Sequence, residues 1–252
     1  MKKLVFSALL LSLVVAAAAL AQVRQPDPRT MRPYVLGILV KGPTWTAERT
    51  PHTDSLQAGH LANIQAMAKS GVLIGAGPIA GNYRERGLFL WKDIPLDSAA
   101  TLARRDPAIR SERLMIEIYR WYAPIGIGEA YRARAARRPD HPDSMIAVPM
   151  ALLERPKEEP KVDSLALVHA NQVHAAMMLD QLESGKLLAA GPVSGNQKLL
   201  GLRFYGTDSA SAAQLVKQDP TVQNGHLAVT MRQWWTAWGV LPPVPTVKEM
   251  GR

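Results

Sequence analysis

The sequence predicts an α+β protein in which two tandem copies of one module pack against each other within a single chain. Three observations support this fold class. The chain repeats a long segment of itself, both copies show the same order of expected elements, and 252 residues leave room for two domains of ordinary size once an N-terminal leader is set aside.

The N-terminus has the composition of a signal peptide. Lys2 and Lys3 precede an apolar run over residues 4–20, which closes on the small residues Ala19 and Ala21. A membrane anchor is the alternative, but the run is shorter than the ~20 apolar residues that a spanning helix prefers. We therefore predict cleavage after Ala21 and export, periplasmic or secreted, with no membrane span after cleavage. The sequence has no cysteine, which excludes disulfides, thiolate metal sites and a cysteine nucleophile.

The internal repeat is visible by eye. The segment 60–78 is matched by the segment 174–192. Corresponding pairs are His60 with His174, Asp106 with Asp219, and Trp121 with Trp234. A period this long indicates duplicated domains rather than a solenoid of short units. The predicted organisation is a signal peptide at 1–21, a first module at 31–123, a basic linker rich in Pro and Arg at 124–144, a second module at 145–241 and a C-terminal tail at 242–252.

Each module is expected to begin with a strand followed by a helix. Runs rich in branched and apolar side chains predict the strands at 34–40 and 145–153. The helices are expected at 55–70 and 166–184. A glycine directly after each one predicts the end of the helix, because glycine readily adopts the left-handed conformation that closes the last turn.

A hairpin, a short helix and a last strand complete each module. The expected hairpin arms are 72–76 with 87–91, and 186–190 with 201–205. The glycines of the Gly-Pro pairs at 77–78 and 191–192 are interpreted as turn residues. The short helices are expected to begin near Asp97 and Asp208, whose side chains can cap them, and to end before the Asp-Pro pairs. The last strands are expected at 114–121 and 227–234.

This order of elements is that of a ferredoxin-like (βαββαβ) module, an antiparallel sheet with both helices on one face. The other face of each sheet would expose apolar side chains, and such a surface usually marks an association site. We therefore predict two modules packed as an intramolecular dimeric α+β barrel, with a higher oligomer left open. The tryptophans near strand ends are expected to pack between the modules: Trp121, Trp234, Trp235 and Trp238.

Both copies resemble the YciI-like (YCII-related) domain family. The resemblance rests on a histidine eleven residues before a glycine, an apolar stretch ending in Ala-Gly-Pro, an Asp-Pro pair and a last strand ending in Trp. It implies dimeric barrels of ferredoxin-like subunits. It also implies, for some members, lyase-type or dehydrochlorinating activity in which a helix histidine pairs with a carboxylate shortly after Gly-Pro. His60 and His174 match that histidine, but Asn82 and Asn196 are the polar residues after Gly-Pro, so the expected acid is missing from both copies.

His60 and His174 are the candidate catalytic residues, each on the apolar side of a predicted helix. Asn82 and Asn196 are candidate ligand-binding residues that could replace the missing acid, although a turn role is favoured. Asp106 and Asp219 are expected mainly to cap or turn the chain, with ligand binding or catalysis as the lesser alternative. No metal or cofactor is predicted, because the other histidines are scattered and the sequence has no phosphate-loop or dinucleotide motif.

The leading functional hypothesis is an exported protein that binds a small molecule near His60 and His174. One alternative is a lyase or isomerase that uses these histidines as general bases, and another is a non-catalytic structural or protein-interaction module. The net charge is +9, or 9 − 2 = +7 without Lys2 and Lys3 of the leader; this charge agrees equally with anionic partners, such as lipid headgroups, polyanions or acidic small molecules, and with a role in solubility alone. Much of it lies at 131–138, which we interpret as a solvated linker helix rather than a nucleic-acid-binding surface.

Overall fold

The computed structural model describes residues 27, 30–138, 143–158, 160–161, 164–196 and 198–242. The predicted signal peptide and nearly all of the predicted C-terminal tail lie outside the described residues. Among the described helices, none combines the length and apolar character needed to cross a bilayer.

The structure confirms the predicted order of elements in both modules. The first module contains β1 (Met31–Lys41), α2 (Pro51–Lys69), β2 (Leu73–Pro78), β3 (Glu85–Trp91), α3 (Leu96–Ala103), α4 (Pro107–Arg110) and β4 (Leu114–Pro124). The helix α5 (Glu129–Arg137) lies in the linker, as expected from its basic sequence. The second module contains β5 (Met145–Glu154), α6 (Ser164–Glu183), β6 (Leu187–Ser194), β7 (Leu199–Tyr205), α7 (Ser209–Lys217), α8 (Pro220–Gln223) and β8 (Ala228–Ala237).

Helix ends follow the expected chemistry with two differences. Gly71 and Gly185 adopt positive φ after α2 and α6, and the Asp208 side chain caps α7. Helix α3 instead begins after Pro95, so Asp97 lies within its first turn and caps nothing. Two short helices, α4 and α8, were not predicted from the sequence. They begin at the prolines of the Asp-Pro pairs because proline suits the first helical position.

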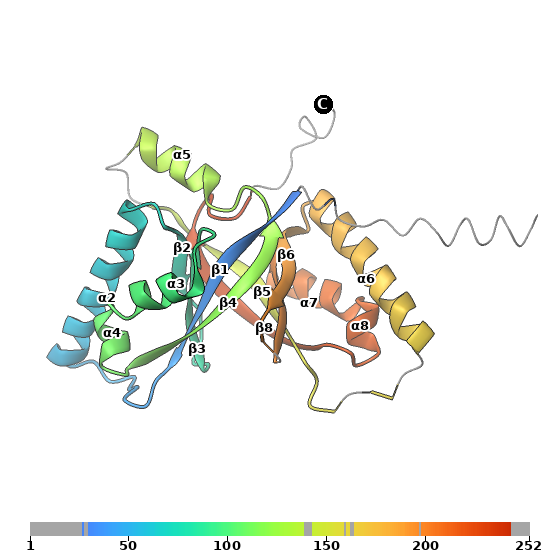
Figure 1. Ribbon diagram of the computed structural model, residues 1–252, viewed down its shortest axis with the longest axis horizontal. Coiled ribbons are helices and arrows are strands. Elements are labelled where there is room, and N and C mark those ends of the chain that lie inside the picture. The colour runs from blue at the N-terminus through green and yellow to red at the C-terminus, as the bar shows by residue number, and fades with distance from the viewer. Residues whose placement is uncertain are drawn as a thin grey trace, which may run out of the picture.

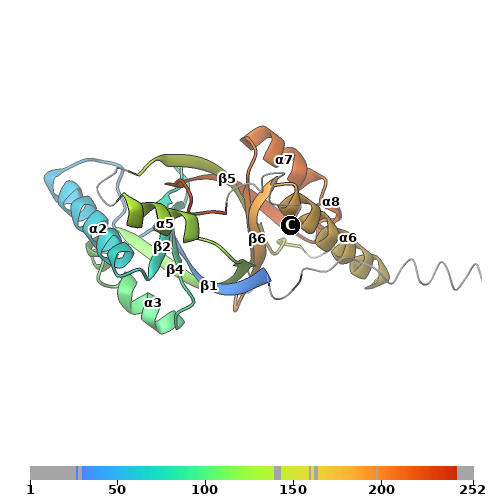
Figure 2. The same ribbon diagram turned by 90° about the horizontal axis from the view of Figure 1, so that it is seen from above.

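The strands form one eight-stranded sheet that is nearly closed into a barrel. Their order is β2-β3-β1-β4-β6-β7-β5-β8, with antiparallel pairing throughout. Strand β4 pairs with β6 of the other module at Trp121↔Val193, and at the opposite side Ile79 of the first module bridges to Trp234. Helices α2–α4 cover one end of this assembly and α6–α8 the other (Figures 1 and 2). The predicted intramolecular dimeric α+β barrel is confirmed.

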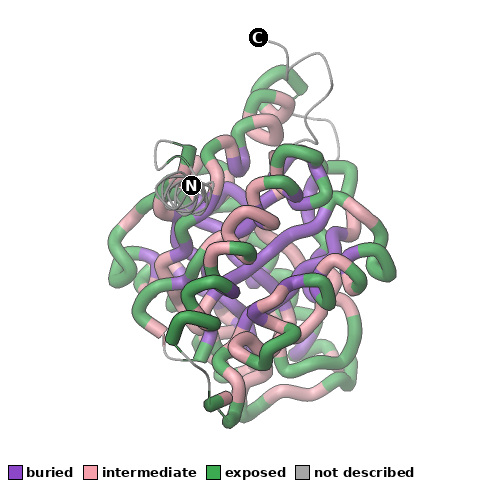
Figure 3. Tube along the Cα trace, turned by 90° about the vertical axis from the view of Figure 1, so that its right-hand side faces the viewer, coloured by how far each residue is buried: buried purple, intermediate pink, exposed green. Residues whose placement is uncertain are grey.

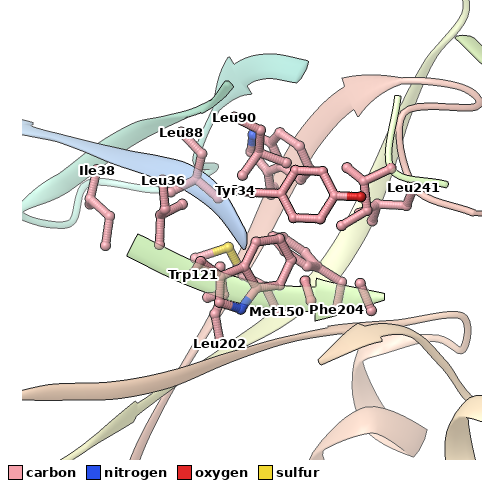
Figure 4. Close-up of a cluster of buried hydrophobic side chains, with 14 of the residues drawn as sticks. Tyr34, Leu36, Ile38, Leu88, Leu90, Trp121, Met150, Leu202, Phe204 and Leu241 are labelled. Carbon is pink, nitrogen blue, oxygen red and sulfur yellow. The ribbon is translucent and has the colours of Figure 1, made fainter. Parts of the chain in front are cut away.

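The centre of the barrel is a shared hydrophobic core. Buried side chains from both modules meet there, with Trp121 packed edge-on to Phe204 and Phe204 against Trp234 (Figure 4). A second and a third cluster lie between each half of the sheet and its own helices. Figure 3 shows the buried positions gathered in the middle of the molecule, whereas much of the outer trace is exposed. The modules therefore bury their bare sheet faces against each other, as their apolar strand patterns predict.

We call the two places where a strand of one module meets a strand of the other the seams. Each seam has a glycine whose carbonyl oxygen accepts a hydrogen bond from a tryptophan of the other module. Trp121 Nε1 donates to the carbonyl oxygen of Gly191 and Trp234 Nε1 donates to that of Gly77, both at 3.1 Å. A Cβ atom at Gly77 would lie 1.8 Å from the Trp235 oxygen, and one at Gly191 would lie 1.8 Å from the Tyr122 oxygen. The interpretation of these glycines as turn residues is wrong, because both lie inside strands whose neighbours approach too closely for a side chain.

The expectation that four tryptophans pack the seam holds for two of them. Trp121 and Trp234 are fully buried there. Trp235 and Trp238 are 40% and 50% exposed, and Trp238 lies instead beside the Arg134 guanidinium of the linker helix. Alternation along β8 explains the difference at Trp235, since neighbouring residues of a strand point to opposite faces.

Candidate functional site

The first candidate site is built on His60, which lies in the middle of α2. Its Nδ1 is 2.6 Å from Asp106 Oδ2, and the Asp106 side chain is wholly buried. Asp106 is the N-cap of α4, so its other oxygen accepts from the Ala108 amide at 2.9 Å. The hydrogen bond of the helix cap therefore fixes the position of the carboxylate that contacts the imidazole. The acid expected after Gly-Pro is missing, and the aspartate of the Asp-Pro pair takes its place beside the histidine.

This contact sets the tautomer of the His60 ring. A carboxylate accepts, so Nδ1 carries a proton, and in the neutral ring Nε2 then has the lone pair. Asn63 adds a long hydrogen bond, its Nδ2 donating to the same Asp106 oxygen at 3.4 Å. Within the residues described, no protein atom hydrogen-bonds to His60 Nε2. The ring therefore presents a bare, basic nitrogen on the side away from Asp106.

A cavity of about 480 Å³ lies beside this histidine, between α2 and the β2–β3 hairpin. Its wall near His60 is mostly apolar and includes Leu61, Ile64 and Phe89. Phe89 is nearly parallel to the imidazole, with ring centroids 5.9 Å apart and an angle of 16° between the planes. The cavity is large enough for a small organic molecule, and its apolar wall would strengthen any polar interaction with the bound ligand.

The second module repeats the pair and adds a cation. His174 Nδ1 lies 2.8 Å from Asp219 Oδ2, and Asp219 caps α8 as Asp106 caps α4. Arg203 occupies the position of Phe89, forms a buried ion pair with Asp219 and approaches His174 Nδ1 to 3.3 Å. Thr221 donates to the second Asp219 oxygen at 2.6 Å. The second carboxylate is therefore shared between a histidine and an arginine.

These contacts lower the pKa of Asp219. Burial by itself would raise that pKa, but the hydrogen bond and charge of His174, the charge of Arg203 and the Thr221 hydroxyl outweigh it and hold the pKa well below the ordinary value. Asp219 is therefore ionised at any pH near neutrality. Arg203 is thus a second cation paired with this carboxylate, whereas among the described residues Asp106 has its ion-pair contact with His60 alone.

The second module also has the larger cavity, of about 730 Å³, at the equivalent place beside α6. His174 lines it together with Met178, Leu182 and Leu188, and Met31 and Pro124 close it from the first module. Leu200 lies on its wall where the first cavity has Arg86. The two cavities are thus related by the repeat, but the second is wider and more apolar.

The candidate asparagines lie away from both histidines. Asn82 is exposed and its Oδ1 accepts from Lys41 Nζ at 2.7 Å. Asn196 closes the β6–β7 turn, its Oδ1 accepting from the amides of Lys198 and Leu199. Neither borders the cavities described here, so neither replaces the acid. The acid is Asp106 or Asp219. Its recurrence 46 residues after His60 and 45 residues after His174 was the signal that could have identified it.

Three further site residues were missed by sequence reasoning: Phe89, Arg203 and Thr221. Each differs between the copies, so the repeat could not single it out. A metal site of three or more histidine or acidic side chains is absent from the described part of the chain.

The sequence matches no protein-family model, and no curated protein is similar to it. Solved structures do share its fold. A candidate chlorite dismutase is 11% identical with a TM-score of 0.51, covering 82% of this chain and 96% of that chain. A haem-binding protein from Thermus thermophilus is 13% identical with a TM-score of 0.48, covering 84% and 95%. A chlorite dismutase mutant from Candidatus Nitrospira defluvii is 10% identical with a TM-score of 0.47, covering 81% and 91%. At 11% identity, the likeness to the candidate chlorite dismutase shows the fold alone.

Proposed function

We propose that this chain binds small molecules in the two cavities and that His60 transfers a proton to or from the ligand in the first. One observation carries the proposal: the 2.6 Å contact of His60 Nδ1 with buried Asp106, which leaves Nε2 for the cavity. The recurrence of the pair at His174 and Asp219 supports a role beyond packing. The resemblance to the YciI-like family, in which such a dyad is expected, agrees with it. We propose that the protein acts after export, as the N-terminal sequence predicts.

The reaction class is acid–base chemistry of the lyase or isomerase type. Nε2 takes a proton from an acidic C–H or O–H of the ligand, and Asp106 stabilises the imidazolium that forms. The apolar wall excludes water and strengthens the attraction between imidazolium and carboxylate. Returning that proton to a different atom gives an isomer, and expelling a leaving group gives an elimination product.

In the second cavity binding is the favoured role. Arg203 ion-pairs with Asp219, so the negative charge that would stabilise a protonated His174 is already compensated. His174 is then better suited to accept a hydrogen bond from a bound neutral molecule at Nε2 than to act as a base. A large apolar cavity with one polar group is typical of a site that binds and orients a small organic ligand.

Exchange of carbon-bound protons tests the proposal without a known substrate. The full chain is incubated in deuterium oxide with a panel of small apolar ketones and esters, and loss of the α-proton signal is followed by NMR. We expect exchange that His60→Ala abolishes and Asp106→Asn slows by about 100-fold, the usual contribution of general base catalysis. His174→Ala is the matched control and should leave the exchange intact. Equal rates in wild type and His60→Ala would refute the proton-transfer role.

Haem is a second ligand to consider, because one structure of this fold is described as haem-binding. The second cavity suits it in part, since a histidine whose Nδ1 is held by a carboxylate is a usual axial ligand. The wall does not suit the two propionates. Its charged residues are Glu183 and Arg203, and Arg203 is already paired with Asp219. We therefore derive no chemistry through haem, and a titration that produced a His174-dependent Soret band would overturn this assignment.

A further inference from the structure

A cluster of cations surrounds Trp45, a residue in the wall of the first cavity. The guanidinium carbons of Arg86 and Arg113 are 4.8 Å and 4.7 Å from the centroid of the Trp45 ring, and Lys41 Nζ is 5.9 Å from it. Trp45 and Arg86 line the same cavity as His60. Cation–π attraction to the indole stabilises each of these positive charges beside the cavity wall, which also carries Gln57, Gln65 and Asp143.

No ion pair to these charges is seen among the residues that the structure describes. In the part of the chain that the structure describes, neither Arg86 nor Arg113 forms an ion pair. Arg86 Nη1 donates to the Gly81 carbonyl oxygen at 2.5 Å, and Lys41 donates to Asn82. Arg86 Nε and Arg113 Nη1 are buried and have no acceptor. Leaving buried charged donors unsatisfied is costly, so such donors usually indicate a missing partner.

We infer that the first cavity binds an amphipathic anion, whose oxyanion head is held by Arg86 and Arg113 and whose apolar body lies along α2 towards His60. This inference rests on the proposed function and names its ligand class. A carboxylate or a phosphate monoester offers the oxygen acceptors that two guanidinium groups require. Leu61, Ile64 and Phe89 supply the apolar wall for the rest of the molecule.

The second module shows what the cavity looks like without this cluster. By the repeat, Leu200 corresponds to Arg86 and His226 corresponds to Arg113. The larger cavity therefore has an aliphatic wall where the first has a guanidinium. The substitutions Arg86→Leu and Arg113→His transfer the second module's residues into the first module, so they suit the same backbone.

Calorimetric titration of the full chain with three eight-carbon probes tests the inference: octanoate, octyl phosphate and octanamide. At low salt we expect at least one anion to bind about tenfold or more tightly than the neutral amide, the usual worth of a charge-assisted hydrogen bond. Preference for octanoate or for octyl phosphate identifies the head group. Arg86→Leu and Arg113→His should each remove most of the preference, while Arg105→Leu, an equal charge change at an exposed position, should keep it.

The outcomes separate this inference from the function on which it rests. Equal binding of octanamide and both anions, lost in His60→Ala, would overturn the anion site but keep the ligand-binding cavity. Failure of all three probes to bind would overturn the inference, and the exchange experiment would then decide the proposed function by itself. If Arg86→Leu unfolds, as circular dichroism would show, Arg86→Gln replaces it, because glutamine keeps the length and a donor without the charge.

Discussion

Gly77 lies so close to strand β8 of the other module that we expect an added methyl group to destabilise the barrel. In Gly77→Ala the new Cβ would lie 1.8 Å from the Trp235 carbonyl oxygen. Restoring an ordinary carbon–oxygen separation of about 3.3 Å requires β8 to move by roughly 1.5 Å. Backbone strain does not enter, because the φ angle of Gly77 lies outside the left-handed region.

That movement breaks the hydrogen bonds of one seam. Trp234 Nε1 donates to the Gly77 oxygen at 3.1 Å and the Ala80 amide donates to the Gln233 oxygen at 2.9 Å, so both distances would exceed the hydrogen-bonding range. At about 1 kcal/mol net for each bond, the loss is about 2 kcal/mol before any cost of repacking the buried Trp234. Gly191→Ala meets the Tyr122 oxygen at the same 1.8 Å and should cost as much at the other seam.

Urea unfolding of the full chain measures these free energies. Gly195→Ala is the control, since a Cβ there meets nothing within 4 Å and only the positive φ of the position is strained, which costs about 1–2 kcal/mol. We expect Gly77→Ala and Gly191→Ala to lose at least as much as this control and their double variant to lose the sum. If both were as stable as wild type, the modules would not be sealed along these strands and the barrel interpretation would fail.

Three more predictions concern single side chains. Trp121→Phe leaves the Gly191 carbonyl without its donor and should lower the free energy of unfolding by about 1–3 kcal/mol, whereas Trp238→Phe at an exposed position should change little; urea unfolding decides. Asp106→Asn should release the His60 ring from its fixed tautomer, seen as a mixed pattern of ring nitrogen shifts in NMR, and an unchanged pattern would contradict the dyad. Arg203→Met should make acid unfolding begin at a higher pH. The pKa of Asp219 is lower in the folded protein than its unfolded value near 3.9, so its ionised carboxylate stabilises the fold above that value, and this stabilisation is lost as the pH falls through the folded pKa. Arg203→Met removes one of the charges that lower the folded pKa, so the loss should begin at a higher pH. Acid unfolding followed by circular dichroism would be unchanged if Arg203 did not stabilise the carboxylate.

Much of the fold was predictable because the repeat gives each element two independent readings. A glycine after each long helix, Asp208 at a helix start and apolar alternation in the strands are local signals, and the structure follows them. The need for glycine at Gly77 and Gly191 could not be predicted from the neighbouring sequence. Their requirement for hydrogen in place of a side chain comes from a strand of the other module, and no neighbouring residue in the sequence reports that approach.

Of the two residues in each dyad, the sequence predicted the histidine as a site residue but not its contact with the carboxylate. The helix histidines carried a signal, since they recur while most neighbours differ. The family resemblance placed the carboxylate partner shortly after Gly-Pro. The acid that contacts His60 is Asp106 instead, at the N-terminus of α4, which packs beside α2. The capping role predicted for Asp106 and the contact with His60 are compatible, because one carboxylate oxygen serves each.

The fusion of the two modules explains why their sites differ. In a homodimer, a substitution such as phenylalanine to arginine beside the histidine would enter both sites at once and change both in the same way. In one chain, position 89 can keep a ring that packs on His60 while position 203 carries a cation that neutralises Asp219. The same freedom allows Arg86 at one cavity and Leu200 at the other. Both cavities still depend on the same pair of seams, so a ligand that stabilises one module also stabilises the barrel that holds the other. Two modules in one chain can therefore carry different residues beside equivalent histidines, a phenyl ring and a guanidinium at the first cavity and a cation and an aliphatic side chain at the second.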